Sequence, residues 1–158
     1  MRALGIDLGS RRIGVAVSDT EGRLATPMEV VTRQGDPRRA GVRHQDHLAL
    51  ARLAREMEAE VLVVGLPLSL DGSVGPAAAK VLAEREEIAA TVGLPVVTWD
   101  ERLTTVTAER VLAEQGVDAR RRRRMVDMVA ASVILQAWLD AGCPTTDHGT
   151  EPRKDPSE

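Results

Sequence analysis

The stretch "RALGIDLGSRRIGVAVSD", residues 2–19, holds two apolar runs, "ALGIDLG" and "IGVAVSD", separated by the polar "SRR". Two apolar runs of this length around a short polar turn predict a pair of antiparallel strands. Asp7 lies within the first run. Because a buried carboxylate without a partner is strongly destabilising, Asp7 needs either a path to water or a cation. The rest of the chain has to supply that partner.

The chain continues with "EGRLATPMEVV", which predicts a third strand of the same antiparallel meander. Residues 33–46 are polar and contain Gly and Pro, so we expect a mobile connection there, the one candidate flap of the chain. His44 and His47 lie in or beside this segment and are expected at the surface, and His148 lies near the C-terminus. These positions provide no ligand set for zinc.

A helix and a buried strand alternate twice in the middle of the chain. Apolar residues recur at helical spacing over 50–57 before "EVLVVGLPL", and again over 78–92 before "LPVVTWDE". Strands joined by helical crossovers pair in parallel. The sequence therefore predicts an α/β fold with a five-stranded mixed sheet, three antiparallel strands and then two parallel strands, with helices on both faces.

Two further helices are expected towards the C-terminus. Thr104 or Thr105 can cap a helix that runs to about Gln115, and Asp118 can cap the last helix, which runs to about Asp140. Ser, Thr, Asp and Asn are favoured at such positions because their side chains accept hydrogen bonds from the first free backbone N–H groups.

Length and composition limit the class of protein. The chain has 158 residues, which predicts one domain over residues 1–143, and residues 144–158 are expected to form a disordered tail because they hold no apolar side chain larger than proline. The single Cys143 excludes an intramolecular disulfide, and the chain shows no leader and no long apolar run, so we expect a cytoplasmic protein without a membrane partner. Phe and Tyr are absent, which argues against binding single strands through stacked aromatic side chains.

Two further acidic positions are as unusual as Asp7. Asp100 and Glu101 stand at the carboxyl end of the last predicted strand, where sites gather in α/β sheets. Asp127 lies in the last predicted helix and shares one face with apolar residues, which would bring it towards the sheet and Asp7. From the residues alone, the choice between Asp100 and Glu101 stays open. The face of the helix consists of Asp127, Ala130, Ala131, Ile134, Leu135 and Trp138.

Carboxylates that converge from two strands and a helix repel one another unless a cation neutralises them. Carboxylate oxygens without a Cys or His cluster favour a hard ion, so the expected cofactor is Mg²⁺ or Mn²⁺, and we expect a pair of such ions. A pair of divalent ions held by carboxylates can activate a water molecule and stabilise the leaving oxygen of a phosphodiester. The expected chemistry is hydrolysis of nucleic acid.

A basic run accompanies these acids although the net charge of the chain is −3. Residues 119–124 read "ARRRRR" and precede Asp127 on the same predicted helix. An isolated basic run is most often a solvated helix face, but arginines beside a metal site can hold a phosphate backbone. The loop "GLPLSLDGS", residues 65–73, borders the same end of the sheet. The candidate nucleic-acid contacts are Arg120, Arg121, Arg122, Arg123 and Arg124, with Arg11, Arg12, Ser69 and Ser73 as additional candidates.

Four ordered blocks of the chain match a known family: "GIDLGSRRIGVAVSD", "VVGLPLSLDGS", "WDERLTTVTAERVL", and the basic run with "VDMVAASVILQAWLD". On these blocks, the chain resembles the YqgF (RuvX) family of bacterial pre-16S rRNA nucleases and Holliday-junction-resolvase-like proteins over residues 3–140. The resemblance implies a ribonuclease H-like fold with Asp7, Glu101 and Asp127 as catalytic, metal-binding carboxylates. It favours Glu101 over Asp100, which remains a further candidate ligand. Thr107 stands where the family often has an acidic residue, a departure that concerns helix capping and not the site.

The resemblance also implies a function. It is that of a hydrolase, a metal-dependent endonuclease that acts on structured nucleic acid and matures the 5′ end of pre-16S rRNA in ribosome biogenesis. Resolution of Holliday junctions in DNA recombination and repair is the alternative. Structured RNA, branched DNA and a ribosomal precursor particle are the expected partners, and the protein is expected as a monomer or a homodimer.

Two other classes of protein compete with a nuclease. "GIDLGSRRIGVAV" also resembles the first phosphate loop of actin-like ATPases and sugar kinases, although those proteins close two such domains over their nucleotide. A non-catalytic RNA- or ribosome-binding module could keep the same fold and the same acids. ATP turnover would reveal the first class, and metal binding without cleavage would reveal the second.

Overall fold

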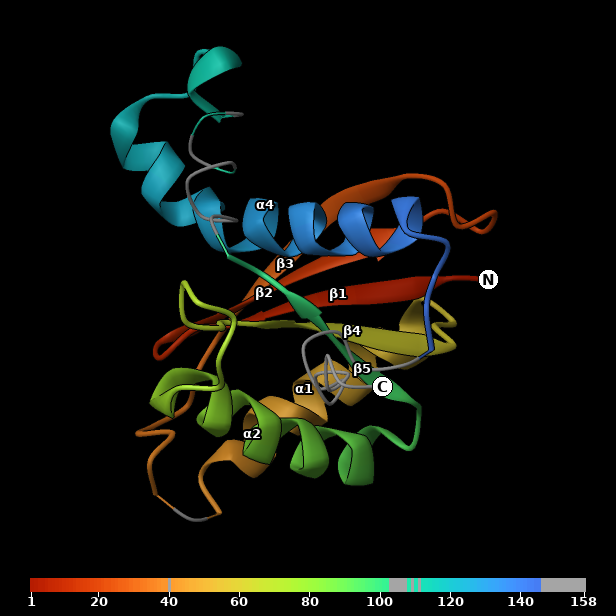
Figure 1. Ribbon diagram of the computed structural model, residues 1–158, viewed down its shortest axis with the longest axis vertical. Helices are drawn as coiled ribbons and strands as arrows, with labels where there is room; N and C mark the ends of the chain where they lie inside the picture. Colours follow the sequence, from red (N-terminus) through yellow and green to blue (C-terminus); the bar gives the residue numbers. More distant parts are fainter. Residues whose placement is uncertain (40, 103–107, 109, 111, 146–158) are drawn as a thin grey trace, which may run out of the picture.

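The computed structural model describes residues 1–39, 41–102, 108, 110 and 112–145, apart from the side chain of Arg124 (Figure 1). Five strands and three helices are bounded in this part of the chain. They are β1 (Ala3–Leu8), β2 (Arg12–Ser18), β3 (Ala25–Thr32), α1 (Arg43–Glu56), β4 (Val61–Leu66), α2 (Pro76–Val92), β5 (Val96–Asp100) and α4 (Ala119–Asp140).

The five strands form one mixed sheet in the order β3-β2-β1-β4-β5. β1 pairs with β2 and β2 with β3 in antiparallel fashion, because the connections between these strands are too short for a crossover. β1 pairs with β4 and β4 with β5 in parallel, since a helix crosses over before each return to the sheet. The mixed sheet expected from the sequence is confirmed.

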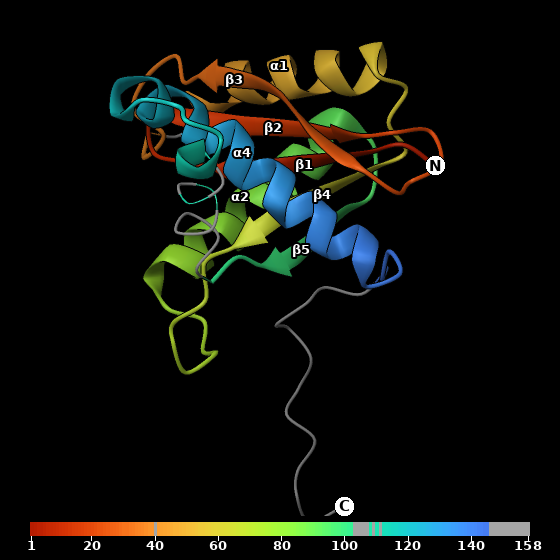
Figure 2. The same ribbon diagram turned by 90° about the horizontal axis from the view of Figure 1, so that it is seen from above.

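Helices cover the two faces of the sheet (Figures 1 and 2). α1 and α2 lie side by side on one face, and α4 crosses the other face. Successive side chains of a strand point to opposite faces of the sheet. In β1, Leu4 and Ile6 therefore pack in the core beneath α1 and α2, whereas Ala3 packs in the core beneath α4. Among the described residues, no helix is long and apolar enough to cross a membrane.

Glycines allow α4 to lie directly on the sheet. A Cβ atom at Gly5 would overlap the backbone carbonyl of Ala131, and one at Gly14 would overlap the backbone carbonyl of Asp127. Gly5 belongs to β1 and Gly14 to β2, so the helix backbone rests on these two strands. The first turns of α4 are thereby fixed above the end of β1 that carries Asp7.

The ends of the C-terminal helices agree with the sequence as far as they are described. Asp118 caps α4, its side chain accepting a hydrogen bond from the N–H of Arg121 at 3.0 Å. Gly116 has a φ of 76° and follows the helical residues 112–114, as expected of a helix stop. The caps proposed at Thr104 or Thr105, and the departure at Thr107, lie outside the described residues.

Pro144, the first residue of the expected tail, contacts α4, and the domain boundary before it stays a prediction. The indole Nε1 of Trp138 donates a hydrogen bond to the carbonyl of Pro144 at 2.9 Å, which ties the first residue of the expected tail to α4. Residues 146–158, with His148, lie outside the described part of the chain.

The segment 33–46 differs from the flap expected at this place. Asp46 and His47 belong to α1, and both are buried, with 1% exposed area each. At the other end of the segment the side chain of Arg33 is buried, and its guanidinium pairs with two carboxylates. His44 is exposed as predicted, but the surface position predicted for His47 is wrong. Arg33 and His47 pair with Glu84, which lies far away in the sequence. The polar composition of the segment does not reveal these pairs.

Candidate active site

Asp7 lies at the end of β1 on the face that α4 covers. It follows Ala3 and Gly5 in the alternation of the strand, and both of these contact the layer of α4. Its antiparallel partner is Gly14, the residue on which the backbone of Asp127 rests. Asp7 and Asp127 are therefore neighbours, and the charge of Asp127 contributes to a raised pKa of Asp7.

Glu101 reaches the same place from β5. Its backbone N–H donates to the carbonyl of Leu66 at 3.1 Å, which holds it beside the end of β4. Its carboxyl group lies over Gly65, because a Cβ atom on that residue would overlap Glu101 Oε2. From there it forms a hydrogen bond with the side chain of Asp7. The small residue at position 65 thus leaves the room in which two carboxyl groups meet.

Both carboxyl groups have raised pKa values. Burial raises the pKa of Glu101 to about 8, with further contributions from the charge of Asp7, the hydrogen bond to Asp7 and the charge of Asp100. Burial also raises the pKa of Asp7 to about 6, with the charge of Asp127 adding to it and the hydrogen bond from Glu101 opposing it. The pair therefore favours a state in which one of the two carboxyl groups keeps its proton. A bound divalent cation would favour the ionised form of both carboxyl groups.

Asp127 faces a cation from the protein itself. The Nε of Arg12 lies 3.0 Å from Asp127 Oδ2, an ion pair at the start of β2. The contact is an ion pair without a hydrogen bond, and the buried Oδ2 atom accepts none. The sequence made Arg12 an additional candidate for binding nucleic acid, which stays a prediction, and the structure places its guanidinium beside Asp127.

Asp100 is engaged differently from Glu101. Its carboxylate accepts hydrogen bonds from Arg102, at 3.0 Å from the backbone N–H and 2.8 Å from Nε. Arg102 in turn donates to the carbonyl of Leu70 at 3.2 Å. Asp100 thereby anchors the loop that follows β4, and its role as a metal ligand stays a prediction.

That loop satisfies its own polar groups. The N–H of Ser69 donates to the carbonyl of Ser73 at 3.0 Å, and the N–H and hydroxyl of Ser73 both donate to Asp71 Oδ1, at 2.9 and 2.6 Å. These bonds engage the N–H of Ser69 and both the N–H and the hydroxyl of Ser73. Contacts from Ser69 and Ser73 to nucleic acid stay predictions.

The arginine run forms the first turns of α4. Arg120, Arg121 and Arg123 are exposed there, and Arg11 is exposed in the turn between β1 and β2. Since α4 rests on Gly14 at Asp127, this basic surface and the carboxylates lie at the same end of the helix. The arrangement agrees with a phosphate backbone approaching the acids, and the contacts themselves stay predictions.

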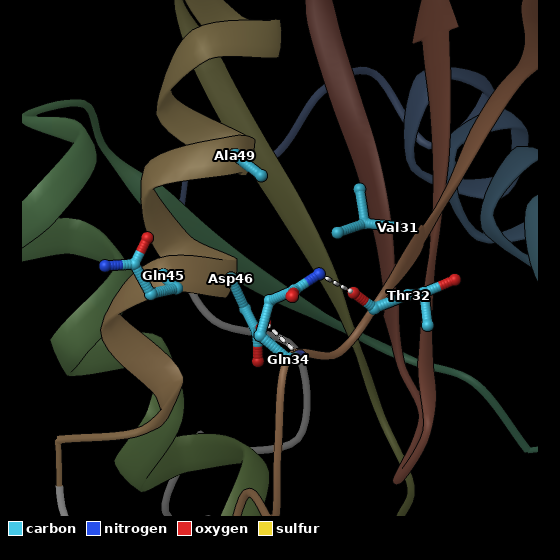
Figure 3. A pocket seen from close by; sticks show the side chains of 6 residues that line it. All are labelled: Val31, Thr32, Gln34, Gln45, Asp46 and Ala49. Carbon is cyan, nitrogen blue, oxygen red and sulfur yellow. Dashed lines mark hydrogen bonds between the residues drawn. The ribbon is translucent and has the colours of Figure 1, made fainter.

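No group of three or more His, Cys, Asp or Glu side chains is arranged to hold a metal ion in the part of the chain that the structure describes. Asp7 and Glu101 are in contact, and Asp127 instead lies against Arg12. A pocket of about 350 Å³ lies elsewhere, between β3 and α1, and it is lined by Val31, Thr32, Gln34, Gln45, Asp46 and Ala49 (Figure 3). The acids therefore meet at the helix–sheet junction and not in that pocket.

Comparison with known proteins agrees with this architecture. A family model described as "RuvX: Holliday junction resolvase" matches residues 1–141. The chain belongs to the RuvX family. The family description is that of a nuclease, so the expected enzyme class is confirmed.

Curated relatives and a solved structure resemble the chain over most of its length. A relative from Anaeromyxobacter sp. (strain Fw109-5), named "Putative pre-16S rRNA nuclease", is 48% identical over 140 residues, which cover 89% of this chain and 97% of that protein. A relative of the same name from Myxococcus xanthus (strain DK1622) is 46% identical over 144 residues, 91% of each chain. The structure of T. thermophilus RuvC in complex with a Holliday junction substrate has a TM-score of 0.57 at 20% identity, and the match covers 93% of this chain and 99% of that one. The likeness to RuvC confirms the ribonuclease H-like fold.

Proposed function

We propose that this RuvX protein is a metal-dependent endonuclease that hydrolyses phosphodiester bonds of structured RNA and processes the 5′ end of pre-16S rRNA. The observation that carries the proposal is the contact between the Asp7 and Glu101 carboxyl groups, with the charge of Asp127 beside them. The names of the curated relatives support the substrate. In this proposal residues 1–143 form the nuclease domain and residues 144–158 a C-terminal tail.

The acids fit a divalent cation chemically. Burial and mutual repulsion make Asp7 and Glu101 reluctant to ionise together, which a bound cation would reverse. Asp127 Oδ2 is a buried oxygen that accepts no hydrogen bond. Carboxylate oxygens of this kind suit Mg²⁺ or Mn²⁺. Asp7, Glu101 and Asp127 would hold two such ions, with Asp100 as a further candidate ligand.

The ions, when bound, would supply a nucleophilic hydroxide and stabilise the leaving oxygen. The residues of the chain prepare for this. Asp7 and Glu101 would lose a proton to solvent when they hold an ion, and Arg12 partly balances the charge of Asp127 in the metal-free protein. The arginines at the start of α4 bind the phosphate backbone on either side of the scissile bond.

Resolution of Holliday junctions is the second candidate, because the family model carries that description. The two substrates share the reacting group, and they differ in the shape that the basic surface must accept. RNA and branched DNA therefore have to be compared directly. Under this proposal the protein acts in the cytoplasm, where ribosomal precursor particles are assembled.

The deciding experiment offers the same preparation a labelled pre-16S RNA and a synthetic four-way DNA junction, with and without Mn²⁺. We expect Mn²⁺-dependent cleavage of the RNA near its 5′ end and weaker cleavage of the junction. Stronger cleavage of the junction would support the resolvase. Tight RNA binding without cleavage under every condition would show a binding module, and ATP turnover would show a nucleotide-handling protein.

A further inference from the structure

A second group of charged side chains is buried on the opposite face of the sheet. It consists of Arg33, Asp46, His47 and Glu84, whose side chains are 3%, 1%, 2% and 9% exposed. Asp46 and His47 lie in α1, Glu84 lies in α2, and Arg33 follows β3. We call this group the Arg33 network. It belongs to neither the proposed carboxylate site nor its basic surface.

Arg33 lies at the centre of the Arg33 network. Its Nη1 and Nη2 donate to the two carboxylate oxygens of Glu84 at 2.8 and 2.9 Å, and Nη1 lies 3.4 Å from Asp46 Oδ2. The Nε2 of His47 lies 2.7 Å from Glu84 Oε2. Burial alone would raise the pKa of Glu84, but the hydrogen bonds from His47 and Arg33 outweigh it and lower the pKa to about 2. The Arg33 network is thus tightly paired.

One side of Arg33 faces the turn between β1 and β2. Its Nε donates to the carbonyl of Gly9 at 2.8 Å, and its backbone N–H donates to the carbonyl of Arg11 at 2.9 Å. The turn is closed by a hydrogen bond from the N–H of Gly9 to the carbonyl of Arg12 at 3.0 Å. Arg33 therefore holds two carbonyls of this turn while Glu84 and Asp46 hold its guanidinium.

The same turn joins two members of the proposed active site. It begins two residues after Asp7 and ends at Arg12, which pairs with Asp127. We propose that Arg33 is a positioning residue for the nuclease: it fixes the turn of residues 9–12, and through it the place of Asp7 and Arg12. This inference rests on the proposed function, because it assigns a task to the residues of that site.

A second ion pair offers a matched control. Arg43 of α1 binds Glu87 of α2, so it links the same two helices, but its other hydrogen bond goes to the carbonyl of Pro37 and not to the turn. His47 is a further control, because its ring contacts Glu84 within the Arg33 network and no atom of the turn. Loss of either control contact weakens the helix layer and leaves the two bonds from Arg33 to the turn in place.

The experiment compares Arg33→Lys with Arg43→Lys and His47→Leu in the full chain. Lysine keeps the charge but has neither the fork that binds Glu84 nor an Nε to reach Gly9. Three quantities are measured: the melting temperature, the amide hydrogen exchange of residues 9–12, and kcat and KM for labelled pre-16S RNA with Mn²⁺.

We expect Arg33→Lys to speed exchange in the turn about tenfold or more and to lower kcat by about tenfold to a hundredfold, with KM changed less than about threefold, because a small displacement of a reacting group affects the chemical step most. His47→Leu should lower the melting temperature at least as much and leave exchange in the turn and kcat near the wild-type values. Arg43→Lys should change little.

A merely structural role for Arg33 would give a different result. Activity would then follow the melting temperature across all three variants, and exchange in the turn would rise no more in Arg33→Lys than in His47→Leu; either finding overturns the proposal. If Arg33→Lys does not fold, Glu84→Gln replaces it, since the neutral amide weakens the anchor of Arg33 and should open the turn by a smaller factor. A wild-type protein that cleaves neither RNA nor junction would overturn the proposed function, and the exchange measurement would still decide whether Arg33 holds the turn.

Discussion

Two groups of buried acids lie on opposite faces of the sheet and differ in how their charge is balanced. In the Arg33 network, Glu84 has a guanidinium and an imidazole within hydrogen-bonding distance, and its pKa is lowered to about 2. Beneath α4, Glu101 has another carboxyl group as its partner, and its pKa is raised to about 8, first by burial and then by Asp7. The first arrangement favours the ionised form of its acid, and the second favours the protonated form.

The difference teaches how to separate structural acids from functional ones. A protein that buries an acid for stability supplies a cation from its own chain, as Arg33 does for Glu84. Acids that are buried together without enough cations are costly, and such sites are kept for a ligand that arrives from solution. Arg12 balances only part of the charge, because it reaches Asp127 and not the Asp7–Glu101 pair.

The largest effect is expected from Asp7→Asn. We expect cleavage of labelled pre-16S RNA in Mn²⁺ to fall by about a thousandfold or more, because a ligand of the reacting ions is lost. The fold should persist, and the melting temperature of the metal-free protein should stay the same or rise, since repulsion with Asp127 is relieved. Undiminished cleavage by this variant would remove Asp7 from the site.

The second prediction compares the free energy of unfolding of variants on the two faces of the sheet. Glu84→Gln should lower the free energy of unfolding by about 3 kcal/mol, because it leaves Arg33 buried with a weakened partner. Glu101→Gln should be close to neutral in the metal-free protein, since the carboxyl group is already protonated near neutral pH. Urea unfolding of both variants without metal measures the difference. A loss in Glu101→Gln equal to that in Glu84→Gln would show that both groups are structural.

The third prediction concerns pH. The pKa of Asp7 rises from 3.8 to about 6 on folding and that of Glu101 from 4.5 to about 8, so the folded protein binds more protons than the unfolded chain between these values. The metal-free protein should therefore lose stability as the pH rises from about 4 to about 8. A difference of one in pKa corresponds to about 1.4 kcal/mol, so the loss should amount to several kcal/mol. Glu84 acts in the opposite sense and at lower pH, because its contribution is lost as the pH falls from 4.5 towards about 2.

Two variants and a cation test the pH prediction by urea unfolding at several pH values. Asp7→Asn should flatten the fall between about pH 4 and 8, and saturating Mg²⁺ should stabilise the wild-type protein more at the upper end of this range than at the lower end. An identical pH dependence in wild-type protein and Asp7→Asn would mean that the raised pKa values do not belong to this pair.

The sequence predicted the face of α4 that carries Asp127 because a helix face repeats at a regular spacing. Ala131, Ile134 and Trp138 are buried between the helix and the sheet as expected. Ala130 is buried as well, but it packs with Ala108 and Leu112 in a separate cluster and not against the sheet. Periodicity identifies which residues are buried; it does not say which neighbour covers them.

The Arg33 network could not be predicted in the same way. Arg33, His47 and Glu84 come from three segments far apart in the sequence, and each stands among other charged or polar residues. Nothing in the local pattern distinguishes Arg33 from the exposed Arg38. His47 precedes Leu50, Ala51 and Ala54 at helical spacing, a signal of burial that the exposed His44 lacks. Only the three-dimensional arrangement shows that these charges neutralise one another. The proposed site was easier to predict, because Asp7 interrupts an apolar strand and Asp127 an apolar helix face.

The smallest effect is expected from Asp118, the other notable acid of α4. Asp118→Ala should lower the free energy of unfolding by about 1 kcal/mol through loss of the helix cap, and it should leave cleavage unchanged. Asp127→Asn on the same helix should lower both the affinity for Mn²⁺ and the rate of cleavage, with little loss of stability. Thermal unfolding and the RNA cleavage assay together separate the two.

The comparison of Asp118→Ala with Asp127→Asn tests whether Asp127 acts in the site because of its position on the helix and not merely because it is acidic. Asp118 is exposed at the N-terminus of α4, whereas Asp127 rests on Gly14, opposite Asp7. Both carboxylates lie on the helix that carries the arginine run, so a general change in surface charge would affect them alike. Equal losses of cleavage in the two variants would mean that the third carboxylate of the site is a different residue, and that Arg12 holds Asp127 for structural reasons alone.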